Sequence, residues 1–233
     1  MYHTISTTAP VLDVIQQRWS PKAFTAQPVG KAQLQPLFEA ARMAASGFNE
    51  QPWQFIVGCK YEDETQYQRV LQCFNDDNRA WAQTAPVVMI VLAKLYFDKN
   101  GMPNPWAWHD VGLAVAQLNL QAVNEGMQLS QAAGILHDKV RETFGVGELY
   151  QPCTGIALGY PGTGDGLNDS LRAKHRHVRT RKPVSSFVHY GMPQLPGLTD
   201  EQQLQTYHLL KNKIAFGNLQ PMIDFFRGKK ETI

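Results

Sequence analysis

A hydroxyl and two carboxamides stand close together on a short bend of the chain. Ser46, Asn49 and Gln51 lie between an amphipathic stretch, residues 31–45, and an apolar stretch, residues 54–59. Carboxamides both donate and accept hydrogen bonds, so the bend suits recognition of a flat ligand ring rich in nitrogen and oxygen. The alternative is a turn that ends a helix and whose side chains satisfy only nearby backbone groups. The bend alone leaves both interpretations open.

Two basic segments supply groups that bind anions. Arg18, Ser20 and Lys22 alternate along one segment, and Arg179 and Arg181 alternate along the other. Residues two apart share a face of an extended chain, so each segment is expected to present its polar groups together. Two neighbouring guanidinium groups form a fork that suits a phosphate dianion. A solvated charged surface is the alternative for either segment.

Helices and strands must position these groups, and apolar spacing indicates where they lie. Helices are expected over residues 11–18, 31–45, 64–75, 109–125 and 137–144, and strands over 54–59, 87–93, 154–160 and 184–190. The strand over 87–93 is apolar throughout, so it must be covered on both faces. Pro36 is expected early enough in its helix to be tolerated, because the first amides of a helix lack partners. The Gly-rich stretch 162–166 is predicted to be a flexible loop, since no helix is expected behind it.

Five short motifs, in order along the chain, resemble those of the nitroreductase family of FMN enzymes. They are Arg18-x-Ser20-x-Lys22, the stretch with Ser46, Asn49, Gln51, Pro52 and Trp53, the helix start Asp110-x-Gly112-x-Ala114, the turn Gly159-Tyr160-Pro161, and Arg179 with Arg181 before Pro183. Each motif is weak alone, but five in family order, over roughly residues 10–190, are specific. The resemblance implies an α+β fold with a mixed, mainly antiparallel central sheet flanked by helices. It also implies a domain-entwined homodimer with two FMN sites at the subunit interface.

The resemblance assigns an FMN site residue by residue. Arg18, Ser20, Arg179 and Arg181 are assigned to the ribityl phosphate and its neighbourhood, and Lys22 to the N1–O2 edge of the ring, which is anionic when reduced. The full set of expected FMN-binding residues is Arg18, Trp19, Ser20, Lys22, Ala45, Ser46, Asn49, Gln51, Gln131, Ala132, Ala133, Gly134, Arg179 and Arg181.

The remaining assignments concern the flavin ring. The resemblance gives Asn49 and Gln51 hydrogen bonds to the ring and ribityl chain, and gives Ser46 a contact from the partner subunit. Residues 131–134 align with the family loop whose backbone N–H donates to flavin N5, and Gly134 permits close backbone approach. Some family members carry an acidic residue at the position of Ala133. Its absence here leaves the backbone contact intact, but the resemblance then does not predict the surroundings of the substrate.

The implied activity is that of an NAD(P)H-dependent flavin oxidoreductase with a ping-pong mechanism. NADH or NADPH is the donor, and a small nitroaromatic, quinone or similar molecule is the acceptor. No catalytic side chain is expected, because flavin N5 carries the chemistry. Trp106, Trp108 and His109 are expected either to line the substrate face or to pack at the edge of the core. Other reactions of the same fold, such as reductive dehalogenation or dehydrogenation, are alternatives, as are a non-enzymatic FMN-binding protein and a basic nucleic-acid-binding module.

Composition indicates an ordinary globular protein with one sizeable core. The 233 residues carry a net charge of +2, with 43% apolar and 18% charged residues. Residues 1–191 are expected to form the FMN-binding domain, and residues 192–233 a helical extension that packs on the dimer. Six Lys and Arg residues lie between Arg172 and Lys182 without an acid. No nucleic-acid-binding motif accompanies them, so an anion pocket is favoured over a nucleic-acid partner.

Cysteines and apolar runs bear on metal and membrane partners. Cys59, Cys73 and Cys153 are far apart and lack metal-ligand spacing, so reduced thiols and no metal site are expected. The longest strongly apolar run is too short to span a bilayer, so no membrane partner is expected. No signal-peptide pattern is evident at the start of the chain, and a cytoplasmic protein is predicted.

Overall fold

The structure, a computed structural model, describes residues 7–193. The chain divides after Val178 into two compact units. The first contains α1 (Asp13–Gln17), α2 (Lys31–Arg42), η1 (Gly47–Asn49), β1 (Trp53–Cys59), α3 (Glu64–Leu71), α4 (Asp76–Ala82), β2 (Val87–Lys94), α5 (Ala107–Asn124), β3 (Gln128–Ala132), α6 (His137–Phe144), β4 (Tyr150–Gly159) and α7 (Asp169–Arg176). The described part of the second unit contains the short 3-10 helix η2 (Val184–Ser186). Residues 194–233 of the predicted C-terminal extension lie outside the described residues.

Four strands form one sheet in the order β1-β2-β4-β3, and all three neighbouring pairs are antiparallel. Val57 of β1 pairs with Met89 of β2, and Ile90 of β2 pairs with Gly155 of β4. A register shift falls between Val91 and Leu92, where β2 meets β4. The predicted α+β fold with a mainly antiparallel sheet is confirmed.

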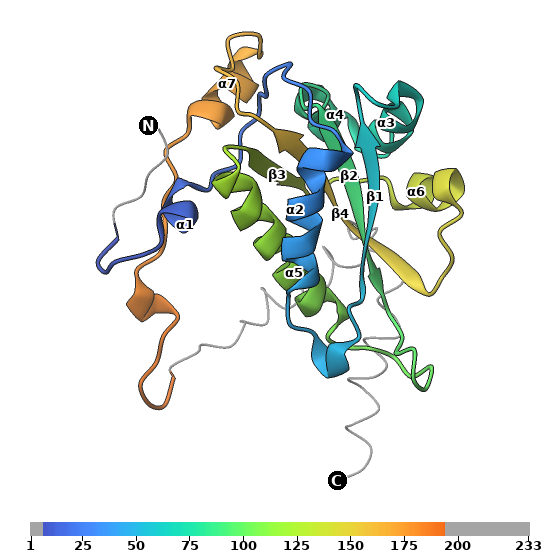
Figure 1. Cartoon of the computed structure of the whole chain (residues 1–233). Coiled ribbons are helices and arrows are strands. Elements are labelled where there is room, and N and C mark those ends of the chain that lie inside the picture. The colour runs from blue at the N-terminus through green and yellow to red at the C-terminus, as the bar shows by residue number, and fades with distance from the viewer. Residues whose placement is uncertain (1–6, 194–233) are drawn as a thin grey trace, which may run out of the picture. The chain divides into compact units, whose positions relative to one another are not determined.

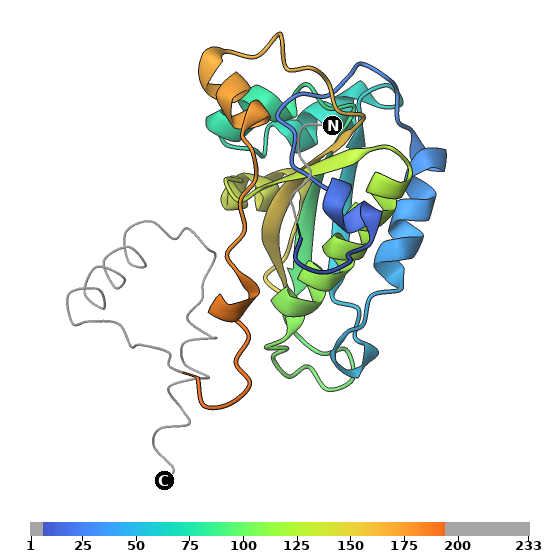
Figure 2. The ribbon, with the colours of Figure 1, turned by 90° about the vertical axis from the view of Figure 1, so that its left-hand side faces the viewer.

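Helices cover both faces of this sheet (Figures 1 and 2). One hydrophobic cluster joins α2 and α5 to Val87, Met89 and Val91 of β2. A second cluster joins α3, α4 and α6 to Val88 and Ile90, which point the other way because strand side chains alternate. Burying each such side chain stabilises the fold by about 1.5–3 kcal/mol. The prediction that β2 is covered on both faces is therefore confirmed.

Besides the short 3-10 helix η1, which lies in the predicted bend, three elements of the first unit are missing from the predicted set: α4, β3 and α7. Both helices begin at an asparagine cap, since Asn75 Oδ1 accepts from the Asn78 N–H at 3.0 Å and Asn168 Oδ1 accepts from the Leu171 N–H at 2.9 Å. β3 was missed because two of its buried side chains, Gln128 and Ser130, are polar. Such a strand lacks the apolar alternation on which strand prediction depends.

Three local predictions are wrong. Pro36 is the sixth residue of α2, beyond the first amides that lack partners, so the predicted reason for its tolerance does not apply. Its side chain is exposed. The loop 162–166 does have a helix behind it, because α7 begins at Asp169. Residues 184–190 form no strand, and only Val184–Ser186 are regular, as a 3-10 helix.

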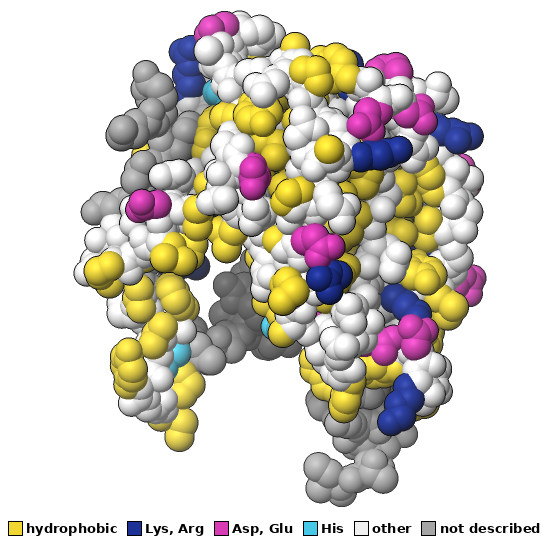
Figure 3. Space-filling model, in the orientation of Figure 1, with side chains coloured by type: hydrophobic (Ala, Val, Ile, Leu, Met, Phe, Trp, Pro, Cys, Tyr) yellow, Lys and Arg dark blue, Asp and Glu magenta, His cyan; other side chains and the backbone are white. Residues whose placement is uncertain are grey.

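The mixed charge of the surface and the state of the three cysteines fit an ordinary globular protein with reduced thiols. Figure 3 shows Lys and Arg side chains interspersed with Asp and Glu over the face that carries α2. Cys59 and Cys73 are buried, Cys153 is half-buried, and all three are free thiols. Burial raises the pKa of Cys153 to about 12, so it stays protonated and unreactive at neutral pH. Among the described residues, no helix is long and apolar enough to cross a bilayer.

Candidate functional site

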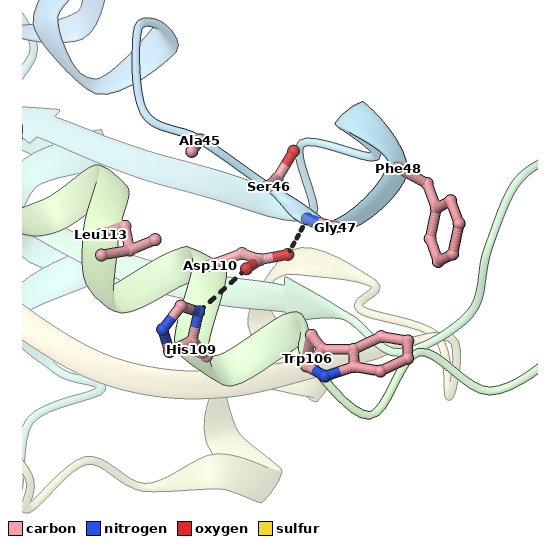
Figure 4. A pocket seen from close by; sticks show the side chains of 8 residues that line it. All are labelled: Ala45, Ser46, Gly47, Phe48, Trp106, His109, Asp110 and Leu113. Carbon is pink, nitrogen blue, oxygen red and sulfur yellow. Dashed lines mark hydrogen bonds and ion pairs between the residues drawn. The ribbon is translucent and has the colours of Figure 1, made fainter.

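A pocket opens between the bend after α2 and the start of α5 (Figure 4). Its volume is about 460 Å³, and its lining residues are Ala45, Ser46, Gly47, Phe48, Trp106, His109, Asp110 and Leu113. We call residues 45–51 the bend. Two of the expected FMN-binding residues, Ala45 and Ser46, therefore lie in a pocket together with the predicted substrate-face residues Trp106 and His109.

A buried carboxylate from α5 fixes the bend. Asp110 has a side chain only 4% exposed, and its Oδ2 accepts a hydrogen bond from the Gly47 N–H at 2.9 Å. Its Oδ1 lies 3.1 Å from Nδ1 of His109, whose side chain is 70% exposed. Asp110 belongs to a motif that the sequence analysis quoted, but no role was assigned to it. The available signal was a carboxylate in the first turn of an otherwise apolar helix.

The backbone of the bend is strained. Phe48, Asn49 and Gln51 have φ values of 54°, 58° and 52°. Non-glycine residues seldom adopt positive φ, and a bulky residue such as Phe48 does so at a cost of about 1–3 kcal/mol. Strain of this kind gathers at ligand-binding and catalytic sites, where neighbouring structure holds it in place.

Hydrogen bonds within and around the bend hold this strained backbone. Ser46 Oγ accepts from the Gln51 N–H at 3.0 Å, and Gln51 Nε2 donates to the Asn49 carbonyl at 3.1 Å. Glu50 Oε1 accepts from the Asp98 N–H at 2.7 Å, which ties the bend to the loop after β2. Ser46 and Gln51 therefore bond to backbone groups of the bend, as the alternative interpretation of a local turn predicts. The side chains of Asn49 and Gln51 are nevertheless exposed.

Aromatic side chains gather at the mouth of the pocket. The ring centroids of Phe48 and Trp106 are 6.2 Å apart, and Phe97 lies 5.6 Å from Phe48 and 6.2 Å from Trp106. Phe48 is 85% exposed and Trp106 49% exposed. An exposed aromatic cluster beside a polar bend offers a stacking surface for a planar ligand.

The second group of expected site residues, which we call the basic segment (residues 18–22), lies along β3. Gln128 Oε1 accepts from the Trp19 N–H at 3.0 Å, and Ser130 Oγ donates to the Pro21 carbonyl at 2.5 Å. Within the segment, Arg18 Nη1 donates to Ser20 Oγ at 3.3 Å. The buried polar side chains of β3 therefore serve to position the basic segment.

Lys22 is partly buried and stacks on an indole. Its Nζ lies 3.8 Å from the ring centroid of Trp81, a cation–π contact. Burial lowers the pKa of Lys22, and the nearby charge of Lys174 lowers it further. An ammonium group that has lost solvation gains more than an exposed one from an anionic partner.

Residues 131–134 comprise the last two residues of β3 and the two that follow it, of which Gly134 lies against α4. Ala132 is buried, and its carbonyl accepts from Thr154 Oγ1 at 2.9 Å. A Cβ on Gly134 would lie 2.4 Å from Asn75 Nδ2 and 2.5 Å from Asn78 Nδ2. The close approach that Gly134 permits in this structure is therefore to α4; a contact between this loop and flavin stays a prediction.

Arg179 and Arg181 belong to the second compact unit. Residues 177–183 have no regular secondary structure, and the backbone is extended at His177 and Pro183, the two ends of this stretch. Arg181 Nη1 donates to the Thr180 carbonyl at 2.8 Å, and Arg179 is half-buried. Their assignment to a phosphate stays a prediction. In the described part of the chain, no group of acidic, His or Cys side chains could hold a metal.

Comparison with known proteins identifies the family of the chain. The model of the nitroreductase family matches residues 15–160, more than half of the sequence. The chain belongs to the nitroreductase family. A protein of Methanothermobacter thermautotrophicus, named as an NADH dehydrogenase/NAD(P)H nitroreductase, is 29% identical over 177 residues, which are 72% of this chain and 86% of that protein.

Solved structures share the fold. The crystal structure of an oxidoreductase containing FMN has a TM-score of 0.75 and 26% identity, over 80% of this chain and 94% of that chain. A nitroreductase family protein from Clostridium difficile 630 has a TM-score of 0.60 and 20% identity, over 79% of this chain and all of that one.

In this nitroreductase the two groups of site residues lie at opposite ends of α5. The bend contacts its first turn through Asp110, whereas Gln128, which holds the basic segment, follows its last turn. At 1.5 Å per residue, the 18 residues of α5 span about 27 Å. The structure thus brings the bend together with Trp106 and His109, and the basic segment together with β3, but it does not bring these two groups together.

Proposed function

We propose that the chain passes electrons from NADH or NADPH through FMN to a small aromatic acceptor by a ping-pong mechanism. Its family makes it an NAD(P)H-dependent oxidoreductase. When bound, FMN accepts a hydride at N5 and gives the electrons to a second substrate. The observation that carries the proposal is Lys22, a partly desolvated ammonium group whose backbone N–H is bonded to His175 of α7 and whose neighbour Pro21 is bonded to Ser130 of β3.

The residues of the basic segment fit FMN. An anionic ring edge would offset the lost solvation of Lys22, and Arg18 with Ser20 offers charged and neutral donors for a phosphate. Arg179 and Arg181 are proposed to complete the phosphate site. Trp19 flanks these donors, and residues 131–134 are proposed to turn a backbone N–H toward N5.

The bend is proposed to complete the site from a second copy of the chain. One ligand ring cannot touch both ends of a helix about 27 Å long, so Ser46, Asn49 and Gln51 would face the FMN held by the partner. The exposed side of α5 carries Gly112 and Ala116, and a Cβ on Gly112 would meet nothing within 4 Å. Such a small-residue face allows a second helix to approach closely, which supports a homodimer.

The pocket of the bend is proposed to receive the acceptor. Phe48 and Trp106 supply a stacking surface, and Ala45 and Leu113 supply apolar walls. His109, oriented by Asp110, can hydrogen-bond to an oxygen-bearing substituent of the acceptor. A nitroaromatic or a quinone has this combination of a planar ring and polar oxygens. Reductive dehalogenation or dehydrogenation of an aromatic substrate would fit the same pocket.

An absorption spectrum of the purified protein tests the proposal. We expect a yellow protein that releases FMN, not FAD, by mass spectrometry and bleaches on anaerobic addition of NADH or NADPH. A yellow protein that neither nicotinamide bleaches would be a carrier of FMN. A colourless protein that gains no colour with excess FMN would overturn the proposal.

Light scattering tests the dimer separately. We expect the mass of two chains in the flavin-bound protein. A monomer with full flavin occupancy would exclude the composite site.

A further inference from the structure

An imidazole from α7 supports the basic segment. His175 is 5% exposed, and its Nδ1 accepts a hydrogen bond from the Lys22 backbone N–H at 3.1 Å. The rings of His175 and Trp19 meet edge to face, with centroids 5.1 Å apart. α7 therefore contacts the basic segment at two of its five residues, one of which is the desolvated lysine.

The glycine-rich loop before α7 holds this imidazole from the other side. Gly164 has a φ of +80°, and a Cβ there would lie 2.8 Å from Cδ2 of His175. Arg172 Nη2 donates to the Leu167 carbonyl at 2.8 Å, and Thr163 Oγ1 donates to Asp165 at 2.6 Å, so both ends of the loop are fixed. The Gly-rich loop 162–166 thus packs against His175.

The charges around His175 come from three elements. Asp165 acts on it from the loop and Arg176 from α7 itself, while the basic segment meets it through the Lys22 backbone N–H, and Lys174 of α7 acts on the Lys22 ammonium group. Burial lowers the pKa of His175 from the ordinary value of 6.5; a hydrogen bond with the Gly162 backbone raises it, Arg176 lowers it and Asp165 raises it. The hydrogen bond from Lys22 requires a neutral ring with a lone pair on Nδ1.

We propose that His175 is a positioning residue for the cofactor-binding segment, and that a proton on its Nδ1 releases Lys22 and weakens FMN binding in acid. The proton comes from solvent and converts Nδ1 from an acceptor into a donor. Two donors then face each other, so the hydrogen bond from the Lys22 N–H is lost. This inference rests on the proposed function, because it takes the basic segment to bind FMN.

The sign of the pH dependence follows from the lowered pKa. The folded protein keeps His175 neutral more readily than the unfolded chain does, so the contribution of His175 to stability is fully present above pH 6.5. That contribution is lost as the pH falls through the lowered pKa of the folded state. FMN affinity should fall in the same interval.

Three variants test this idea through FMN affinity at pH 7.5 and pH 5.0, measured by quenching of flavin fluorescence. His175→Gln keeps an acceptor but does not titrate, and His175→Leu removes the acceptor. His177→Gln is the matched control, since His177 is an exposed neighbour two residues away. FMN phosphate itself takes up a proton near pH 6, so only differences between proteins are informative.

We expect the wild type and His177→Gln to lose up to about tenfold more affinity between the two pH values than His175→Gln does. His175→Leu should bind FMN weakly at both pH values. If His175→Gln loses affinity in acid as steeply as the wild type, or if His175→Leu binds as tightly as the wild type at pH 7.5, the proposal is overturned.

A second measurement needs no cofactor. In the ¹⁵N-labelled protein without FMN, the Lys22 amide resonance should titrate together with the His175 ring in the wild type and stay constant in His175→Gln. A Lys22 amide that does not follow the ring would overturn the positioning role. If no variant binds FMN at any pH, the proposed function fails while this titration still decides the role of His175.

Discussion

The bend and the basic segment are held in place in different ways. The bend has three positive φ angles; Gly47 is bonded to the buried Asp110 of α5, and Glu50 is bonded to the loop after β2. The basic segment is held by side chains of two other elements, Gln128 and Ser130 of β3 and His175 of α7. One region thus stores backbone strain that two carboxylates, Asp110 and Glu50, hold in place, and the other distributes its support over hydrogen bonds from two elements.

This difference predicts where each region is sensitive. Removing Asp110 leaves a strained backbone and a half-buried N–H without its acceptor, so the effect should appear in folding stability. Loss of one hydrogen bond from the basic segment leaves the others in place, so the effect should appear in ligand affinity. If both regions belong to one composite site, changes in either should also reduce FMN occupancy.

The largest effect on ligand affinity is expected from the cations outside both regions. Changing Arg179 and Arg181 together to Ala should weaken FMN binding by about two to four powers of ten, because each charge-assisted hydrogen bond contributes about 1.5–3 kcal/mol. The control changes Lys99 and Lys182 to Ala, which removes the same charge from exposed positions. Isothermal titration with FMN measures both. Equal losses in the two double variants would mean that only net charge matters.

Subunit complementation tests whether the bend and the basic segment share a site across two copies. One variant carries Arg18→Ala and Ser20→Ala, and the other carries Asn49→Ala and Gln51→Ala. Each alone should purify with little FMN. A mixed dimer, selected with two affinity tags, contains one site with all four changes and one unaltered site. We expect one FMN per mixed dimer; a mixed dimer as empty as its parents would place both regions in the same chain's site.

The buried carboxylate offers a test through stability. Asp110→Ala should lower the free energy of unfolding by about 1–3 kcal/mol, because it leaves the half-buried Gly47 N–H of a strained backbone without its partner. Asp77→Ala, at an exposed position in the first turn of α4, is the control and should change it by less than about 0.5 kcal/mol. Urea unfolding of the two variants measures the difference. An Asp110→Ala protein as stable as the control would show that the bend does not depend on this carboxylate.

The sequence predicted the fold better than the contacts that support the candidate site, and the FMN-binding residues themselves stay a prediction. Apolar runs with a clear period, such as β2 and α5, were found because packing on one or two faces dictates their composition. β3 was missed since Gln128 and Ser130 bond to the basic segment, a long-range role that no local period records. The contacts of Asp110 and His175 also join residues 63 and 153 positions apart, so only the folded chain reveals them.

The smallest expected effect concerns Lys22 and the reduction of bound FMN. Lys22→Met keeps a similar length and removes the ammonium charge, so FMN should stay bound with lower affinity. The charge interacts more strongly with anionic reduced flavin than with oxidised flavin, and only such a difference alters the redox equilibrium. We expect a more negative two-electron potential, by about 30 mV for each 1.4 kcal/mol of lost interaction, and slower reduction by NAD(P)H.

Lys60→Met is the matched control, because Lys60 also approaches an aromatic ring, that of Tyr67 at 5.7 Å, but lies outside the basic segment. Potentiometry and stopped-flow reduction are done on flavin-saturated proteins, so that occupancy does not enter the comparison. If Lys22→Met keeps the potential of the wild type with FMN in place, Lys22 does not face the ring edge, and its lowered pKa reflects only its burial and the nearby charge of Lys174.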